Sequence, residues 1–218
     1  MFNIDLTILF LRIPAAFCAL VLHEMVKAHC STWMGDPLPK KSGLMSGNPF
    51  KYLEPIGFII TLVFGFGWGR PTPTSPLYYK DRHKGIFVTY LTPSLVNLFF
   101  GLTAALFVGA LDITAGYAVQ GADPIVAYII TWLFRFILTF AHCSVAIALF
   151  NMIPVPPLDA SKLLQSAVSP NLAVKLSQNE KVLQLVLFML IVFGIVSGVI
   201  VPATNTLIYA AGGFTGGG

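Results

Sequence analysis

The run IPAAFCALVL at residues 13–22 contains no polar side chain, and it forms the centre of an apolar segment from about residue 5 to residue 34. The segment becomes polar at His23, Glu24 and Lys27, but a Gly-Asp-Pro sequence that would break a helix follows only later. About 20 apolar residues suffice to cross the hydrocarbon core of a bilayer. We therefore predict a membrane-spanning helix over about residues 5–34, with ionisable groups in its last third.

The composition of the whole chain is that of a membrane protein. Of its 218 residues 56% are hydrophobic and only 10% are charged, and the mean hydropathy is +0.80. Soluble domains carry about 25% charged residues and could not bury so much apolar surface. The composition excludes a disordered or collagen-like chain and predicts an integral membrane protein surrounded by lipid. The net charge of +4 does not indicate a nucleic-acid partner, because basic residues of membrane proteins mainly mark cytoplasmic loops.

Three further segments are long and apolar enough to span a membrane, at about residues 85–111, 124–150 and 182–201. Residues 55–69 are also apolar, but at about 15 residues they are short for a crossing, so we expect a re-entrant or buried segment there. The fold predicted is an all-α bundle of about four spans in a single membrane domain, residues 1–202. The Gly-rich residues 203–218 are expected to form a frayed tail.

The distribution of basic residues predicts the orientation of this bundle. Three of the 13 basic residues (Arg12, Lys27 and Arg135) lie inside predicted spans, and the other ten lie within residues 35–84 and 160–181. The opposite loop, residues 112–123, has two acidic residues and no basic one. If residues 55–69 do not cross the membrane, both basic segments lie on one side. The positive-inside rule then places them in the cytoplasm and the N-terminus outside.

Two clusters of polar residues lie where predicted spans meet this cytoplasmic side. The first contains His23, Glu24 and Lys27, and the second is FNMIPVPPLD at residues 150–159, which ends in Asp159. Ionisable groups at membrane depth are costly and are candidates for function by default. Because both clusters lie near the same membrane surface, their side chains can meet in one site.

These motifs resemble the site-2 protease family of intramembrane zinc metalloproteases, in particular its small bacterial members. The resemblance covers about residues 13–164 in the family's order of motifs. It implies a bacterial inner-membrane location and single-span membrane proteins as substrates. The matching elements are His23-Glu24 with Gly35-Asp36-Pro37, NPFKYLEPIG at 48–57, GWGRP at 67–71, TPSLVN at 92–97 and FNMIPVPPLD at 150–159.

The resemblance implies a zinc site, but one ligand position is altered. In the family's HExxH motif two histidines and a later aspartate bind zinc, and the glutamate activates a water molecule; His23, Glu24 and Asp159 match three of these positions. Lys27 stands at the second histidine. An ammonium group has no lone pair for a metal, and two ligands are too few for tight zinc binding. The sequence therefore argues against an intact hydrolytic site, with His23 and Asp159 as the metal ligands only if zinc is retained. We expect the Lys27 ammonium to take the place of the metal and to pair with Asp159, with Glu24, or with both. Alternatively, the long Lys27 side chain could reach the membrane interface.

Three further polar residues lie within or at the end of predicted spans. The resemblance implies that Asn97 and Asn151 hold backbone or substrate, while hydrogen bonding between helices is the simpler alternative. His142 could be a hydrogen-bonding group of the bundle or a replacement metal ligand.

The sequence thus supports three hypotheses for function. The first is a site-2 protease homologue that is impaired or inactive in hydrolysis because of Lys27, and that binds transmembrane segments or regulates an active relative. The second is an active zinc endopeptidase that uses His23, Asp159 and an unrecognised third ligand, with Glu24 activating water. The third is an unrelated channel or transporter, which the ordered motifs and the absence of an internal repeat disfavour.

Overall fold

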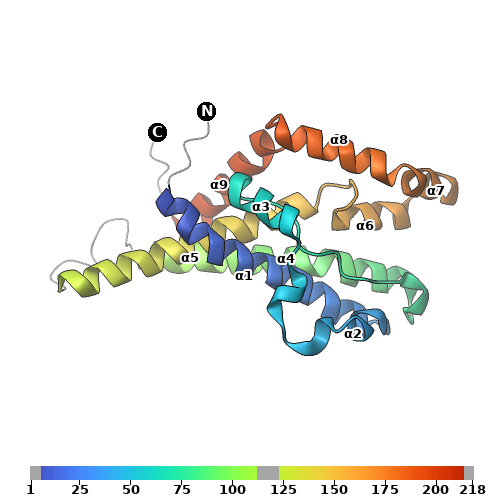
Figure 1. Cartoon of the computed structure of the whole chain (residues 1–218), viewed down its shortest axis with the longest axis horizontal. Coiled ribbons are helices and arrows are strands. Elements are labelled where there is room, and N and C mark those ends of the chain that lie inside the picture. Colours follow the sequence, from blue (N-terminus) through green and yellow to red (C-terminus); the bar gives the residue numbers. More distant parts are fainter. Residues whose placement is uncertain (1–5, 112–122, 214–218) are drawn as a thin grey trace.

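The computed structural model describes residues 6–111 and 123–213, and in these parts of the chain it contains helices and loops but no strand. Three long helices lie side by side: α1 (Leu6–Trp33), α4 (Arg82–Ala110) and α5 (Pro124–Asn151) (Figure 1). All three are long and apolar enough to cross a membrane, and a bent pair of later helices could form a fourth span. The expected all-α membrane bundle is therefore confirmed.

Small residues let these helices approach one another closely. Ala15, Ala16 and Ala19 of α1 are fully buried and pack against Cys143 and Ile147 of α5. Small side chains at helix interfaces are the usual means of packing in membranes, where the hydrophobic effect does not drive helices together. One face of the apolar run of α1 thus packs in the centre of the bundle, while Ile13 and Cys18 on the run are exposed.

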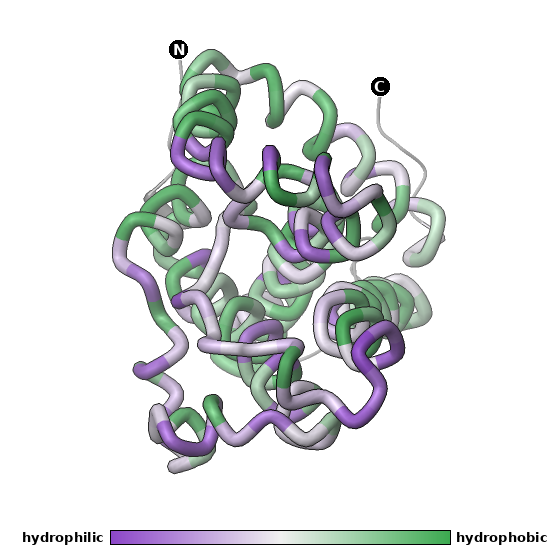
Figure 2. Tube along the Cα trace, turned by 90° about the vertical axis from the view of Figure 1, so that its right-hand side faces the viewer, coloured by the Kyte–Doolittle hydropathy of each residue, from purple (hydrophilic) through white to green (hydrophobic). Residues whose placement is uncertain are grey.

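Short polar elements gather at one end of the bundle. Figure 2 faces this end, where hydrophilic residues follow the loops in front of the more hydrophobic helices. Whether this end lies in the cytoplasm stays a prediction. The elements are α2 (Leu38–Lys41), η1 (Leu44–Ser46), η2 (Pro49–Tyr52), η3 (Pro76–Tyr78), α6 (Asp159–Ala167) and α7 (Pro170–Gln178).

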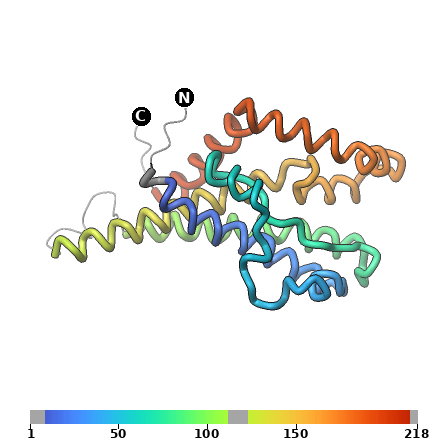
Figure 3. Tube along the Cα trace, in the orientation of Figure 1, coloured from blue at the N-terminus to red at the C-terminus, as the bar shows by residue number. Residues whose placement is uncertain are grey.

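The short apolar segment forms α3 (Pro55–Phe64), followed by a non-helical strap, residues 65–75, that leads back towards the start of α4 (Figure 3). The Glu54 carboxylate caps α3 by accepting from the Gly57 amide, and Gly65 ends it with a positive φ of 84°. Ten helical residues extend only about 15 Å, too little to cross a bilayer. This length agrees with a re-entrant or buried segment, although its depth in the membrane stays a prediction.

The C-terminal part differs from the expectation. In place of one span over residues 182–201 there are two helices, α8 (Glu180–Val192) and α9 (Ser197–Gly212), bent by 69°. Gly194 adopts φ 75° in the turn between them, which interrupts the helix. The prediction of a tail from residue 203 is wrong, because α9 continues to Gly212 and packs against α4 at Gly109. Residues 214–218 and the acidic loop at 112–122 lie outside the described residues.

Candidate active site

Three ionisable side chains of α1 lie buried inside the bundle. His23, Glu24 and Lys27 are 1%, 3% and 5% exposed. His23 and Lys27 are four residues apart, so they lie one turn apart on the same helix face. Charged residues are almost never so deeply buried without partners, so the partners of this cluster define what it can do.

The fourth member, Asp159, comes from the other end of the chain. Helix α5 ends at Asn151, and the proline-rich turn after it leads to Asp159, the first residue of α6. A carboxylate is favoured there because the amides at a helix N-terminus carry partial positive charge. Asp159 Oδ2 lies 3.0 Å from His23 Nε2, so the two polar clusters of the sequence do meet.

Lys27 joins the two carboxylates. Its Nζ atom lies 2.8 Å from Glu24 Oε1 and 2.8 Å from Asp159 Oδ1. The ammonium is thus enclosed between two acids, and the side chain does not extend to a polar surface. Burial alone would raise the pKa of Asp159, but the nearby Lys27 ammonium and the hydrogen bond from His23 outweigh it and hold this pKa below its ordinary value.

The strap supplies the wall above Glu24. Thr72 donates a 2.9 Å hydrogen bond to Glu24 Oε2, so both oxygens of this carboxylate have a donor. Gly69 lies so close to Glu24 that an added Cβ would be 2.5 Å from Glu24 Cγ. The sequence marked this segment through its Gly-Trp-Gly-Arg-Pro motif but gave no signal for Thr72, because nothing in the motif shows which side chain faces α1.

Asp36 fixes the ends of the elements that surround the site. Its carboxylate accepts hydrogen bonds from Ser31 Oγ at the end of α1, from the Leu38 amide and from the Ser75 amide at the end of the strap. The strap is also held near its middle, where the Arg70 amide donates to the Tyr52 carbonyl. We call the group of His23, Glu24, Lys27 and Asp159 the cation cluster. The Gly-Asp-Pro sequence therefore organises the wall of the site without belonging to this cluster.

The other polar candidates have different positions. Asn97 donates from Nδ2 to the Ala19 carbonyl, a bond between α4 and α1 one turn before His23. Asn151 donates to its own helix at the Ile147 carbonyl and lines the cavity beside Glu24 and Asp159. His142 does not line that cavity; it lines a separate one.

The donor set does not fit a tetrahedral zinc ion. A catalytic zinc site needs three protein ligands with lone pairs directed at one point. Within the described residues no three His, Cys, Asp or Glu side chains are placed to hold a metal. Where a third ligand would stand, the ammonium of Lys27 contacts both carboxylates instead. The adjoining cavity measures about 90 Å³ and is walled by Trp68, Thr72 and Tyr90 among others, so a few water molecules would fill it.

Comparisons with known proteins identify the family. Residues 15–195 match the family described as "Peptidase family M50". The chain is 31% identical over 187 residues to "Putative zinc metalloprotease YwhC" of Bacillus subtilis (strain 168). The aligned region covers 84% of this chain and 81% of that protein. No solved structure matches. The chain is an integral membrane protein that belongs to peptidase family M50, the site-2 protease family of zinc metalloproteases.

Proposed function

We propose that this chain is a site-2 protease homologue in which a buried ion-pair cluster takes the place of the zinc centre, and that it does not hydrolyse peptide bonds. The contact that carries the proposal is the Lys27 ammonium at 2.8 Å from both Glu24 and Asp159. In an active site of this family Glu24 would activate water and Asp159 would bind the metal. Here Lys27 engages both carboxylates.

Electrostatics supports this assignment. A divalent cation bound by His23 and Asp159 would lie next to the Lys27 ammonium, and two cations at such separation in a water-poor site repel strongly. Lys27 would have to leave or lose its proton before a metal could enter. The neighbouring carboxylates oppose both changes because they stabilise the charged ammonium. The cluster is therefore closed to zinc as long as Lys27 keeps its position.

Metal analysis of the full chain, purified in detergent without a polyhistidine tag, tests the proposal. We expect well below one zinc per wild-type chain and no cleavage of a single-span membrane peptide above that of Glu24→Gln. Lys27→His should restore a second imidazole one turn from His23 and bring zinc towards one per chain. Lys162→His is the matched control, because Lys162 lines the same cavity without pairing with either acid.

Two outcomes would contradict the proposal. One is a wild-type chain with about one zinc ion that cleaves the peptide and loses this activity on Glu24→Gln; that result would establish the active endopeptidase. The other is equal zinc uptake by Lys27→His and Lys162→His, which would mean that position 27 has no special relation to a metal site.

For a protein without hydrolysis we propose a binding role towards single-span membrane segments or towards an active relative. Family membership supports membrane-embedded partners. We expect a labelled single-span peptide to bind the full chain in nanodiscs. We also expect Thr72→Trp, which fills the cavity beside the site, to weaken that binding while Arg135→Gln leaves it unchanged. Equal binding by the two variants would contradict recognition at this site.

We further propose that the chain lies in a bacterial inner membrane with its N-terminus outside and the cation cluster near the cytoplasm. The grouping of ten of the 13 basic residues within residues 35–84 and 160–181 supports this orientation. A cysteine at Ser46, in a variant without the three natural cysteines, should react with a membrane-impermeant maleimide only after the cells are opened. Labelling of intact cells would reverse the orientation.

A further inference from the structure

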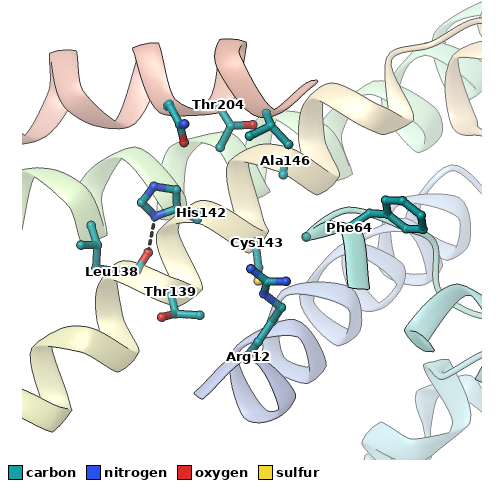
Figure 4. A pocket seen from close by; sticks show the side chains of 11 residues that line it. Arg12, Phe64, Leu138, Thr139, His142, Cys143, Ala146 and Thr204 are labelled. Atoms are coloured by element: carbon teal, nitrogen blue, oxygen red, sulfur yellow. Dashed lines mark hydrogen bonds between the residues drawn. The ribbon is translucent and has the colours of Figure 1, made fainter. Parts of the chain in front are cut away.

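A second cavity, of about 330 Å³, is shown in Figure 4 and lies beside the N-terminal part of α1, before the residues of the cation cluster. Residues of α1, α3, α5 and α9 line it, and Figure 4 shows side chains from these helices around one space. Arg12 lies eleven residues before His23 on α1, which corresponds to about 16 Å along the helix axis. The cavity thus lies at a different level along α1 and shares no lining residue with the site described above.

Arg12 brings a positive charge to this cavity. Its Nη1 donates to the carbonyls of Leu62 (2.8 Å) and Val63 (3.4 Å) in the last turn of α3. The ion pairs among the described residues involve Lys27 and His23, and none involves Arg12. A guanidinium has five N–H donors in a fixed fork, which suits the oxygens of a phosphate or carboxylate.

Thr204 of α9 lines the same space and has a buried hydroxyl. The residue is 3% exposed, it lines the cavity, and its Oγ1 has no hydrogen-bond partner among the described residues. Thr139 and Thr206 instead donate to the carbonyl four residues earlier in their own helices, at 2.7 and 2.9 Å. A buried polar group without a partner costs free energy, so the Thr204 hydroxyl points to a ligand that completes its hydrogen bonding.

His142 of α5 adds an acceptor. Its Nδ1 lies 2.8 Å from the Leu138 carbonyl, which can only accept, so Nδ1 carries the proton (Figure 4). In the neutral ring Nε2 then has a lone pair for a donor group of a ligand. The cavity therefore combines a cation, a hydroxyl and an imidazole acceptor on walls that are otherwise largely apolar.

An adjoining hollow of about 450 Å³ extends the cavity along the turn between α8 and α9. The two share Arg12, Phe64 and Val201, and the second continues over Gly194 and Gly198. A shallow, mainly apolar depression that begins beside an arginine matches an amphiphile with an anionic head and a hydrocarbon chain.

We propose that this cavity binds an anionic phospholipid with a hydroxylated headgroup, such as phosphatidylglycerol. Arg12 and Thr204 donate to the phosphate oxygens, a headgroup hydroxyl donates to His142 Nε2, and an acyl chain follows the hollow past Gly194 and Gly198. The site is independent of metal binding and of peptide hydrolysis, so it stands whether or not the proposed function does.

Native mass spectrometry of the full chain in detergent, titrated with dioctanoyl phosphatidylglycerol and dioctanoyl phosphatidylcholine, tests the site. The anionic lipid should bind about tenfold or more tightly than the zwitterionic one. Arg12→Gln should weaken binding of the anionic lipid by about tenfold or more, because it removes charge-assisted hydrogen bonds. Arg135→Gln is the matched control: Arg135 is an exposed cation of α5 that lines neither hollow.

A second variant keeps the test decisive if Arg12→Gln fails to fold. Thr204→Val preserves the side-chain shape and removes the unpaired hydroxyl, so the lipid-free chain should unfold at a higher temperature while the anionic lipid binds about tenfold more weakly. Equal affinity for the two lipids would overturn the proposal. So would unchanged lipid binding by Thr204→Val. Displacement of the anionic lipid by millimolar inorganic phosphate, lost in Arg12→Gln, would identify a soluble anion as the ligand instead.

Discussion

Lys27 and Arg12 are two cationic side chains of α1, and their hydrogen-bond partners differ. Lys27 is enclosed by two carboxylates at 2.8 Å, while Arg12 donates to the backbone carbonyls of Leu62 and Val63 and has no acid paired with it in the described parts of the chain. The first charge is balanced inside the protein. The second has no acidic partner among residues 6–111 and 123–213, and this contrast underlies the two different proposals for the two sites.

Because of this difference in partners, replacing Lys27 should affect the stability of the fold, whereas replacing Arg12 should mainly affect ligand binding. Breaking a buried ion pair leaves an uncompensated charge and costs much more than the pair contributes to stability. Replacing a cation that contacts only backbone carbonyls and a cavity should lower the free energy of unfolding much less. The two ends of α1 therefore predict different responses to the same kind of substitution.

The largest effect is expected for replacing each cation by methionine. Lys27→Met leaves Glu24 and Asp159 buried together without their cation, so the free energy of unfolding should fall by about 3–5 kcal/mol. Arg12→Met removes the hydrogen bond to Leu62 and should cost about 1 kcal/mol. Unfolding of both variants in mixed micelles by SDS measures the two losses. Similar losses would remove the distinction between the cations.

A double-mutant cycle compares how strongly each cation is coupled to Asp159. Lys27→Met combined with Asp159→Asn should destabilise by less than the sum of the single changes, with a coupling of between about 0.5 and 3 kcal/mol. Arg12→Met with Asp159→Asn is the control, and these two should be additive within about 0.5 kcal/mol because they share no partner. An additive Lys27 and Asp159 pair would show that their contact carries no net interaction.

A third comparison concerns packing at the two sites. Gly69→Ala places a Cβ 2.5 Å from Glu24 Cγ and 2.9 Å from the Tyr52 carbonyl, and should destabilise by about 1–3 kcal/mol. Gly198, beside the lipid hollow, has no atom within 4 Å of an added Cβ. Gly198→Ala should therefore leave stability unchanged or raise it by up to about 1 kcal/mol, since alanine favours a helix. Thermal unfolding distinguishes the two, and equal losses would contradict the difference in packing.

The sequence predicted the long helices well because length and apolarity are direct properties of a span. It could not predict the bend between α8 and α9. Hydropathy treats Gly194 as one more small residue of an apolar run, whereas the turn depends on its positive φ of 75°. Pro202 lies inside α9, so helix is present on both sides of a residue that usually ends one.

The candidate site was predictable to a similar degree. The spacing of His23, Glu24 and Lys27 placed them together on α1, and the motif at residues 150–159 suggested Asp159 as their partner. Thr72 and Thr204 carried no signal, because their importance depends on which atoms surround each hydroxyl in three dimensions. The same reason explains why Arg12 was recognised only as a basic residue inside a span.

The hydrogen bonds that Asp36 accepts from Ser31, Leu38 and Ser75 anchor the strap from outside the cation cluster. An exchange at position 27 therefore alters the chemistry of the pocket without releasing the surface above it. Shape and reactivity can then evolve separately in this scaffold. Under the proposed function, recognition would need only the outline of the pocket, which these hydrogen bonds hold without any contribution from residue 27.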